Sequence, residues 1–288
     1  MAESLQSVRF ALPRDTLVVR GPDRKSWLDG LVTCQVTGVS PGKAAYGLLL
    51  TKQGKIVSDV FLTDDGAQLF IGLALGHGAS VHELLDRYLV MEDAELSTSD
   101  AAFAWLLAPE GTNSAQGEGV LAQGSLELGT LHCAVQVTRG LAEGLAPASD
   151  LSAVLAQHGL GSFGVDFDQQ DNPHEASLDR IAVSWTKGCY LGQEVVCMQD
   201  MRGKVKRRLV ALSGDAELLS RLRATAGRTD VVAAGGESVG HVTSAHAGSS
   251  GETRLLASLA SAALESQSSL TVLGQAVRVV EAAPPLLS

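Results

Sequence analysis

Apolar residues early in the chain are grouped in short runs that polar, glycine-containing turns separate. Three such runs follow one another, with Gln53-Gly54 and then Asp64-Asp65-Gly66 between them. Turns of this composition favour tight hairpins, so the pattern predicts three consecutive antiparallel strands. The predicted strands are residues 45–51, 55–63 and 68–73.

Two other segments carry the helical period. Residues 23–31 begin with Asp23, which can cap a helix, and they place their apolar side chains on one face. Residues 79–89 repeat apolar side chains such as Val81 and Leu85 at helical spacing. We expect both helices to bury these stripes in a core.

Beyond residue 203 the helical period largely disappears, and short alternating strands separated by glycine turns take its place. This texture is typical of a small β-barrel or sandwich. We therefore expect an α+β region over residues 1–202 and a β-barrel domain over residues 203–288. The expected barrel strands are residues 205–212, 238–244, 253–260 and 270–280.

Composition indicates a globular protein of a reducing compartment. The chain has 288 residues, 45% of them hydrophobic, which is enough to bury a large core. Its cysteines are scattered without a C-x-x-C pair, so no disulfide framework or zinc motif is expected. No secretory signal or membrane-length apolar run occurs, and a cytoplasmic location without membrane contact is expected. The net charge of −10 disfavours direct binding of nucleic acid.

Side chains with functional groups are most concentrated in residues 185–194, which read W-T-K-G-C-Y-L-G-Q-E. The glycines allow sharp turns and close approach to a ligand. Apolar positions that follow predict a short helix over residues 192–201, so Cys189 comes just before a helix N-terminus, with Lys187 two residues away. Both features favour a thiolate, and Cys189 and Lys187 are the candidate catalytic residues. The alternative is that Cys189 merely packs a tight turn.

A basic cluster follows the predicted helix in this otherwise acidic chain. It could bind an anion such as a phosphate or a polyglutamate tail, or it could be a solvated strand edge that discourages pairing with other chains. The second interpretation is favoured for most of the cluster, with Arg202 the exception because it is nearest to the motif. The cluster consists of Arg202, Lys204, Lys206, Arg207 and Arg208.

Carboxylates are frequent between residues 166 and 179. Their order does not match a calcium-binding loop, which has a central glycine and a terminal glutamate. We expect solvated or capping roles for them and predict no metal site. These residues are Asp166, Asp168, Asp171, Glu175 and Asp179.

The stretch from Lys187 to Glu194, K-G-C-Y-L-G-Q-E, resembles the signature of the YgfZ family of folate-binding proteins. These proteins are relatives of the glycine-cleavage T-protein and include the mitochondrial factor that helps to assemble [4Fe-4S] clusters. Further matching stretches fall in the family's order over nearly the whole chain. They include residues 18–23, 46–50, 173–176, 202–209 and 240–244.

The resemblance implies a fold and a ligand. The fold is α+β, with T-protein-like subdomains arranged around a central opening and followed by a C-terminal β-barrel. The ligand is tetrahydrofolate or a one-carbon derivative of it. A pterin needs a hydrogen-bonding edge, a face for packing and a cation for its glutamate tail.

Six residues of the chain are candidates for folate binding. Asp59 is expected to face the folate nitrogens, Trp185 or Tyr190 to pack on the ring, and Arg202 to bind a tail carboxylate. Two polar side chains of the motif are expected to order the loop. They are Gln193 and Glu194.

Two departures from the T-protein argue against aminomethyl transfer. Trp185 stands where the T-protein has a carboxylate that grips the pterin, and Ser58-Asp59 offers one carboxylate in place of an acidic pair. Cys189 adds a thiol that the T-protein pattern lacks, and a thiol suits redox, sulfur or iron–sulfur work.

The function that the resemblance implies is therefore that of a tetrahydrofolate-binding accessory protein for assembly or repair of iron–sulfur clusters. It would act with iron–sulfur assembly proteins or client enzymes and would indirectly support enzymes that modify tRNA. The alternatives are a folate-dependent aminomethyl or one-carbon transferase and a purely structural interaction module.

Overall fold

The computed structural model describes residues 9–98, 103–109, 119–140, 145–146, 148–203, 205–266 and 269–280. Contacts within the chain group it into two compact units. Unit 1 comprises Met1–Leu151 and Arg180–Val195, and unit 2 comprises Ser152–Asp179 and Val196–Ser288. The expected domains, residues 1–202 and 203–288, remain a prediction about how the chain divides.

Unit 1 contains the predicted hairpins. Strands β4 (Ala45–Leu50), β5 (Ile56–Asp64) and β6 (Gln68–Ala74) pair antiparallel in succession, which confirms the expectation from the apolar runs. Strand β2 (Arg14–Arg20) then pairs with β6, and β7 (Glu95–Thr98) pairs with β2. The resulting sheet has the order β4-β5-β6-β2-β7.

Both predicted helices of unit 1 cover the core beside this sheet. They are α1 (Arg24–Asp29) and α2 (Gly78–Asp86), each shorter than its apolar pattern suggested. Leu28 of α1 and Leu85 of α2 are almost fully buried, in one cluster with side chains of β2, β5 and β6. The helical stripes are therefore core, as expected.

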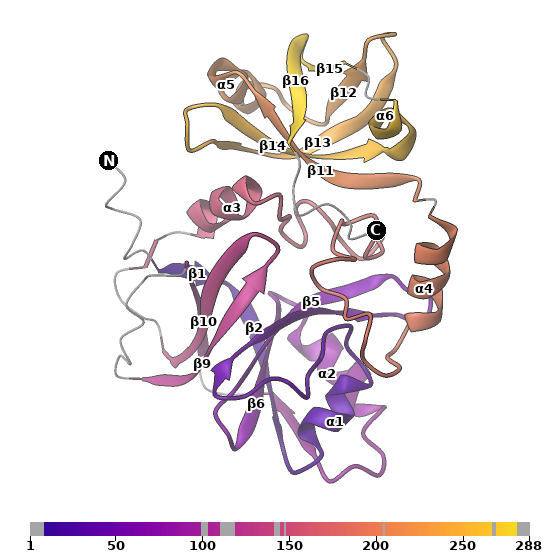
Figure 1. Cartoon of the computed structure of the whole chain (residues 1–288). Helices are drawn as coiled ribbons and strands as arrows, with labels where there is room; N and C mark the ends of the chain where they lie inside the picture. Colours follow the sequence, from indigo (N-terminus) through magenta and orange to yellow (C-terminus); the bar gives the residue numbers. More distant parts are fainter. Residues whose placement is uncertain are drawn as a thin grey trace. The chain divides into compact units, whose positions relative to one another are not determined.

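A second five-stranded sheet completes unit 1, in the order β1-β8-β10-β9-β3. Strands β9 and β10 form a long hairpin (Figure 1). Strand β3 adds a two-residue parallel pairing with β9 at the edge of the sheet. The strands are β1 (Phe10–Leu12), β8 (Phe103–Pro109), β10 (Leu131–Arg139), β9 (Val120–Leu128) and β3 (Gly42–Lys43).

The two sheets of unit 1 meet where a glycine makes room for a tryptophan. Trp105 of β8 is 1% exposed, and its indole N–H donates to the hydroxyl of Thr16 on β2 at 2.9 Å. A Cβ atom on Gly72 of β6 would lie only 2.8 Å from a ring atom of Trp105. The absence of a side chain at Gly72 is therefore a packing requirement of the sheet contact.

Unit 2 contains the predicted barrel, which is closed in the order β11-β14-β13-β12-β15-β16 (Figure 1). Its interior is apolar and includes Leu212, Leu255 and Val272, all fully buried. The strands are β11 (Arg207–Gly214), β12 (Thr229–Ala233), β13 (Ser238–Ala247), β14 (Thr253–Ala260), β15 (Leu270–Val272) and β16 (Gln275–Val280).

Unit 2 contains elements that the sequence did not predict, among them strand β12 and two helices. Helix α5 (Ala216–Ala224) was not expected, and its Leu218 is fully buried in the barrel core. The single strand expected over residues 270–280 is a hairpin, because Leu273 and Gly274 turn the chain with φ values of 50° and 76°. A short helix, α6 (Ser261–Glu265), follows β14.

Two further helices, α3 (Ala148–Gln157) and α4 (Gln193–Arg202), each continue from unit 1 into unit 2. The position of α4 confirms the helix predicted after the motif. Over the described residues, no helix combines the length and the apolar character that a membrane span requires.

We predict that Gly72→Ala destabilises the protein by about 1–3 kcal/mol, because the added methyl group overpacks the Trp105 ring. Gly38→Ala is the matched control, since a Cβ there meets nothing within 4 Å and should change stability by less than about 0.5 kcal/mol. Urea denaturation of both variants measures the difference. Equal stability of the two would mean that the sheets can separate slightly at no cost.

Candidate functional site

The side chain of Lys187 lies inside unit 1 and anchors the motif. It is 1% exposed, and its ammonium donates to the backbone carbonyls of Asp29, Val32 and Cys34, the last two at 2.9 and 2.8 Å. The Asp29 carboxylate is 3.4 Å away. Burial lowers the pKa of Lys187, and Asp29 and Cys34 offset part of that effect.

Backbone hydrogen bonds attach the same segment to the loop that follows α1. The Ser184 N–H donates to the Thr33 carbonyl at 2.9 Å, and the Leu191 N–H donates to the Gly30 carbonyl at 3.1 Å. Gly192 has a φ of 82°, and a Cβ there would lie 2.5 Å from the carbonyl oxygen of Thr51. These hydrogen bonds fix both ends of the segment. Position 192 requires glycine, because a side chain there would collide with the Thr51 carbonyl.

Burial sorts the other side chains of the motif into two groups. Tyr190 is 6% exposed, and its ring centroid lies 5.7 Å from the Lys187 ammonium. Cys189 and Trp185 are exposed, and the Arg180 guanidinium lies 5.6 Å from the centroid of the Trp185 ring. Cys189 and Trp185 can therefore meet a ligand or a partner, whereas Lys187 and Tyr190 hold the segment in place.

Three residues separate Cys189 from Gln193, the first residue of α4. Glu194 in the first turn and Arg202 in the last turn are both exposed, and each has the charge that its end of the helix favours. Gln193 is partly buried, and its N–H donates to the Tyr190 carbonyl at 3.1 Å. The polar residues of the motif thus form the start of the helix, and the loop-ordering role of their side chains stays a prediction.

Asp59 is part of a buried ion pair that the sequence did not reveal. Its carboxylate, 3% exposed, accepts two hydrogen bonds from the Arg14 guanidinium, one of them 2.9 Å long, and one from the Tyr46 hydroxyl at 3.3 Å. Arg14 also lies over the ring of Phe61, 4.7 Å from its centroid. Burial opposes and Asp59 supports the charged form of Arg14, and its pKa is raised on balance. The only sequence signal for this partner is one arginine at the start of an apolar strand.

Two cysteines differ from Cys189 in being buried in unit 1. Burial raises the pKa of the Cys34 thiol to about 12, and the nearby Lys187 only partly opposes this effect. Burial also raises the pKa of Cys133 to about 12. Both side chains are therefore neutral packing groups near pH 7.

Part of the basic cluster pairs with carboxylates inside unit 2. Arg207 Nη2 lies 2.9 Å from Asp171 Oδ1, and Arg208 Nη1 lies 3.3 Å from Asp179 Oδ1. These two arginines are thus paired with carboxylates of the acidic loop, residues 166–179, while their side chains stay 45% and 34% exposed. Lys204 lies outside the described residues.

Other carboxylates of the acidic loop have the capping roles that the sequence predicts. Asp166 accepts hydrogen bonds from the Ser162 N–H at 2.9 Å and from the Thr243 hydroxyl at 2.6 Å. Asp168 accepts one from the Gln170 N–H at 2.7 Å. These contacts tie the loop to itself and to β13 of the barrel.

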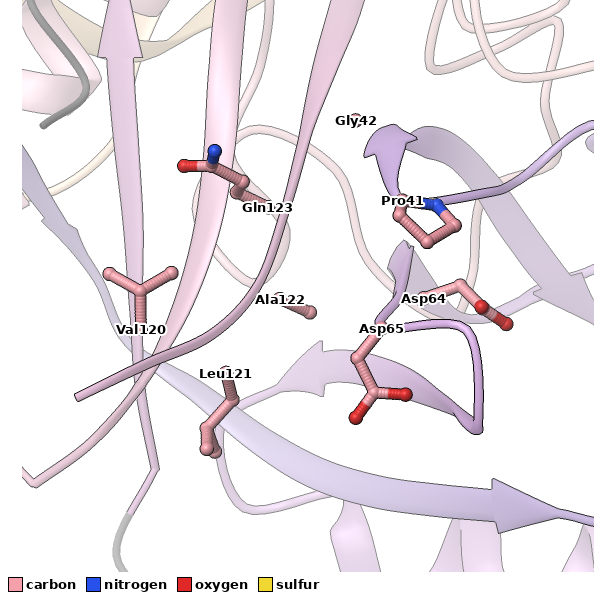
Figure 2. A pocket seen from close by; sticks show the side chains of 8 residues that line it. All are labelled: Pro41, Gly42, Asp64, Asp65, Val120, Leu121, Ala122 and Gln123. Atoms are coloured by element: carbon pink, nitrogen blue, oxygen red, sulfur yellow. The ribbon is translucent and has the colours of Figure 1, made fainter. Parts of the chain in front are cut away.

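A cavity of about 520 Å³ lies in unit 1 between the β5–β6 turn and the start of β9 (Figure 2). Its size is that of a small-molecule site. Asp64, on one wall, is engaged by Arg24 Nε at 3.2 Å and by the Lys25 ammonium at 3.4 Å. The lining does not include any of the predicted folate-binding residues. The cavity is lined by Pro41, Gly42, Asp64, Asp65, Val120, Leu121, Ala122 and Gln123.

The whole chain has the fold of a glycine-cleavage T-protein. It is similar to the crystal structure of the aminomethyltransferase T of the glycine cleavage system from Bartonella henselae, with a TM-score of 0.73. The likeness covers 96% of this chain and 86% of that one at 14% sequence identity, so it shows the fold alone. The α+β class with a C-terminal barrel is thereby confirmed.

Within this class the chain is a relative of the YgfZ proteins. It is 27% identical to the tRNA-modifying protein YgfZ of Vibrio atlanticus over 217 residues, or 67% of this chain and 65% of the relative. It is also 26% identical to the mitochondrial iron–sulfur cluster assembly factor IBA57 homologue of Pyricularia oryzae, over 68% of this chain and 54% of that protein. The matched region thus spans less than two thirds of either relative. No model of a known protein family matches the chain.

We predict that Lys187→Met lowers the free energy of unfolding by roughly 3 kcal/mol, because three buried carbonyls lose a charged donor. Lys52→Met, at an exposed position, is the control and should have almost no effect. Urea denaturation measures both. Unchanged stability together with slower alkylation of Cys189 would instead support the catalytic role that the sequence suggested for Lys187.

Proposed function

We propose that this protein is a cytoplasmic tetrahydrofolate-binding accessory protein for assembly or repair of iron–sulfur clusters, with an indirect role in tRNA modification. Its similarity to a tRNA-modifying protein, YgfZ, and to an iron–sulfur cluster assembly factor, IBA57, supports the proposal. The observation that carries it is the exposed thiol of Cys189 on a segment that the buried Lys187 fixes. A rigidly presented thiol is suited to chemistry rather than to packing.

Cys189 is the residue that would act on the cluster. Thiolates are the usual ligands of iron in iron–sulfur clusters, so an exposed cysteine can receive a cluster or help to pass it to a client enzyme. In this role Cys189 would be a ligand of the iron–sulfur cluster that is transferred, and the protein would not need to turn over a substrate. Iron–sulfur assembly proteins and cluster-dependent enzymes are the proposed partners.

Tetrahydrofolate is the proposed cofactor, and the chain's residues fit it in part. The exposed ring of Trp185 offers a face for the pterin, Glu194 offers a hydrogen-bonding carboxylate, and the exposed Arg202 offers a cation for the glutamate tail. Asp59 fits the pterin less well than the sequence suggested, because Arg14 and Tyr46 already occupy its carboxylate. Binding of folate through Asp59 would require that this ion pair open.

The same ion pair argues against the alternative, a folate-dependent aminomethyl or one-carbon transferase. A general base must reach the reacting proton in its charged form and without a competing partner. Asp59 is buried and paired. By the resemblance to the T-protein, Trp185 stands where a pterin-gripping carboxylate is expected, and Ser58 leaves Asp59 as a single carboxylate in place of an acidic pair. Purified protein that transferred a methylene group to or from tetrahydrofolate would nevertheless establish the alternative.

We predict that Cys189→Ala leaves the stability of the protein within about 0.5 kcal/mol of the original, because the side chain is exposed. The variant should fail to restore an iron–sulfur-dependent tRNA modification in cells that lack the protein. Cys197→Ala, on α4, is the control and should restore it. Full complementation by Cys189→Ala would exclude the thiol from the function.

We predict that tetrahydrofolate raises the melting temperature of the purified protein, by an amount that corresponds to about 2.7 kcal/mol at roughly 100 times its dissociation constant.

Arg202→Ala should weaken the binding of polyglutamyl folate more than that of monoglutamyl folate, and added salt should reduce the difference. Lys206→Ala, at another exposed basic residue, is the control. The absence of any shift with reduced folates would refute folate binding while leaving the role of Cys189 open.

A further inference from the structure

Unit 2 brings together one imidazole and two carboxylates from three places in its sequence. His174 and Asp179 lie at the two ends of the loop before residue 180, and Asp200 lies on α4. One possible ligand atom of each lies within 4.8 Å of those of the other two. His174 and Asp179 are almost fully buried, whereas the Asp200 side chain is 33% exposed and provides access from solvent.

The spacing of these atoms suits a small cation. A tetrahedral metal with bonds of about 2.1 Å to nitrogen and oxygen separates its ligand atoms by roughly 3.4 Å. His174 Nε2 and Asp200 Oδ1 are 3.5 Å apart, which is close to that separation and long for a direct hydrogen bond.

The loop that holds His174 is rigidly built. The Asn172 side chain accepts hydrogen bonds from the N–H groups of His174 and Glu175, both at 3.0 Å. The loop is attached to β11 at Leu209, whose N–H donates to the Glu175 carbonyl at 2.8 Å and whose carbonyl accepts from the Ser177 hydroxyl at 2.7 Å. Ligands on such a platform lose little conformational freedom when they bind an ion.

Arg208 provides the second layer of the cluster. Its guanidinium lies 3.3 Å from one oxygen of Asp179 and orients that carboxylate, as hydrogen-bonded partners of metal ligands do. Two carboxylates against one guanidinium leave an excess of negative charge that a divalent cation would balance.

We infer that His174, Asp179 and Asp200 bind a divalent first-row transition metal. One nitrogen and two carboxylate oxygens without sulfur favour ions such as Mn²⁺, Fe²⁺, Co²⁺ or Zn²⁺ over the all-oxygen sites of Ca²⁺. Three protein ligands leave at least one position for water or another ligand. The metal would link α4 to the acidic loop within unit 2, and it lies outside the residues assigned to folate and to Cys189.

Co²⁺ is the probe for the test, because its visible absorption reports coordination and a sulfur-to-cobalt band in the near ultraviolet identifies thiolate ligands. The full-length protein should bind one Co²⁺ with visible absorption and without the sulfur band. Asp200→Asn keeps the shape of a partly exposed side chain and should weaken binding at least about tenfold, as should His174→Gln. Glu217→Gln, at an exposed carboxylate of α5, is the matched control and should bind like the original.

Melting curves without metal show whether each variant folds, and if His174→Gln does not, Asp200→Asn alone decides. Three results would overturn the inference. They are no binding of Co²⁺, binding that reports only sulfur ligands, and binding that Asp200→Asn leaves unchanged. In each case the cluster would be an ion-pair network. The proposed function would stand, because neither Cys189 nor folate enters this experiment.

Discussion

The buried ammonium of Lys187 is the interaction on which the rest of the candidate site depends. Taking a charge out of water is costly unless hydrogen bonds replace its hydration. Here the backbone carbonyls of Asp29, Val32 and Cys34 and the Asp29 carboxylate supply that replacement. Asp29 is the last residue of α1, so one of these hydrogen bonds also satisfies a carbonyl at the end of that helix. Ordering each loop residue costs about 1–2 kcal/mol in backbone entropy, and this anchor offsets part of it.

Next to this anchor, burial distinguishes the side chains that hold the motif in place from those that a ligand can reach. The side chains of Lys187 and Tyr190 face the interior, whereas Trp185 and Cys189 face solvent. The same criterion separates Cys189 from Cys34, whose pKa of about 12 makes it a packing group despite the lysine beside it. A cation close in space is thus not enough to make a thiolate, because at Cys34 the effect of burial on the pKa outweighs that of Lys187.

Local features of the structure could be predicted from the sequence, and features that join distant segments could not. The hairpins of β4 to β6, the helix after the motif and the barrel follow from turn residues and periodicity within short windows. Helix α5 was missed because its apolar stripe is short and lies among charged residues. Arg14 and Asp59 are 45 residues apart, and Lys187 is 153 residues or more from its carbonyl partners, so no local pattern indicates these contacts. The resemblance to YgfZ pointed to the residues of the motif, but it did not indicate that Lys187 and Tyr190 are buried while Trp185 and Cys189 are exposed.

The T-protein fold does not by itself determine the chemistry of this chain. A fold places a carboxylate on β5, and the neighbours of that carboxylate decide what it can do. Here Arg14, stacked on Phe61, holds Asp59 in a buried pair, and removing one partner from such a pair costs about 3–5 kcal/mol. A ligand that used Asp59 would have to supply a comparable interaction before any proton could move. A ligand or cluster that approaches Cys189 meets no such cost, because the thiol is already exposed and its supporting contacts lie beneath it. Under the proposed function the T-protein fold is therefore a scaffold, and a ligand reaches the exposed Cys189 without opening a buried ion pair.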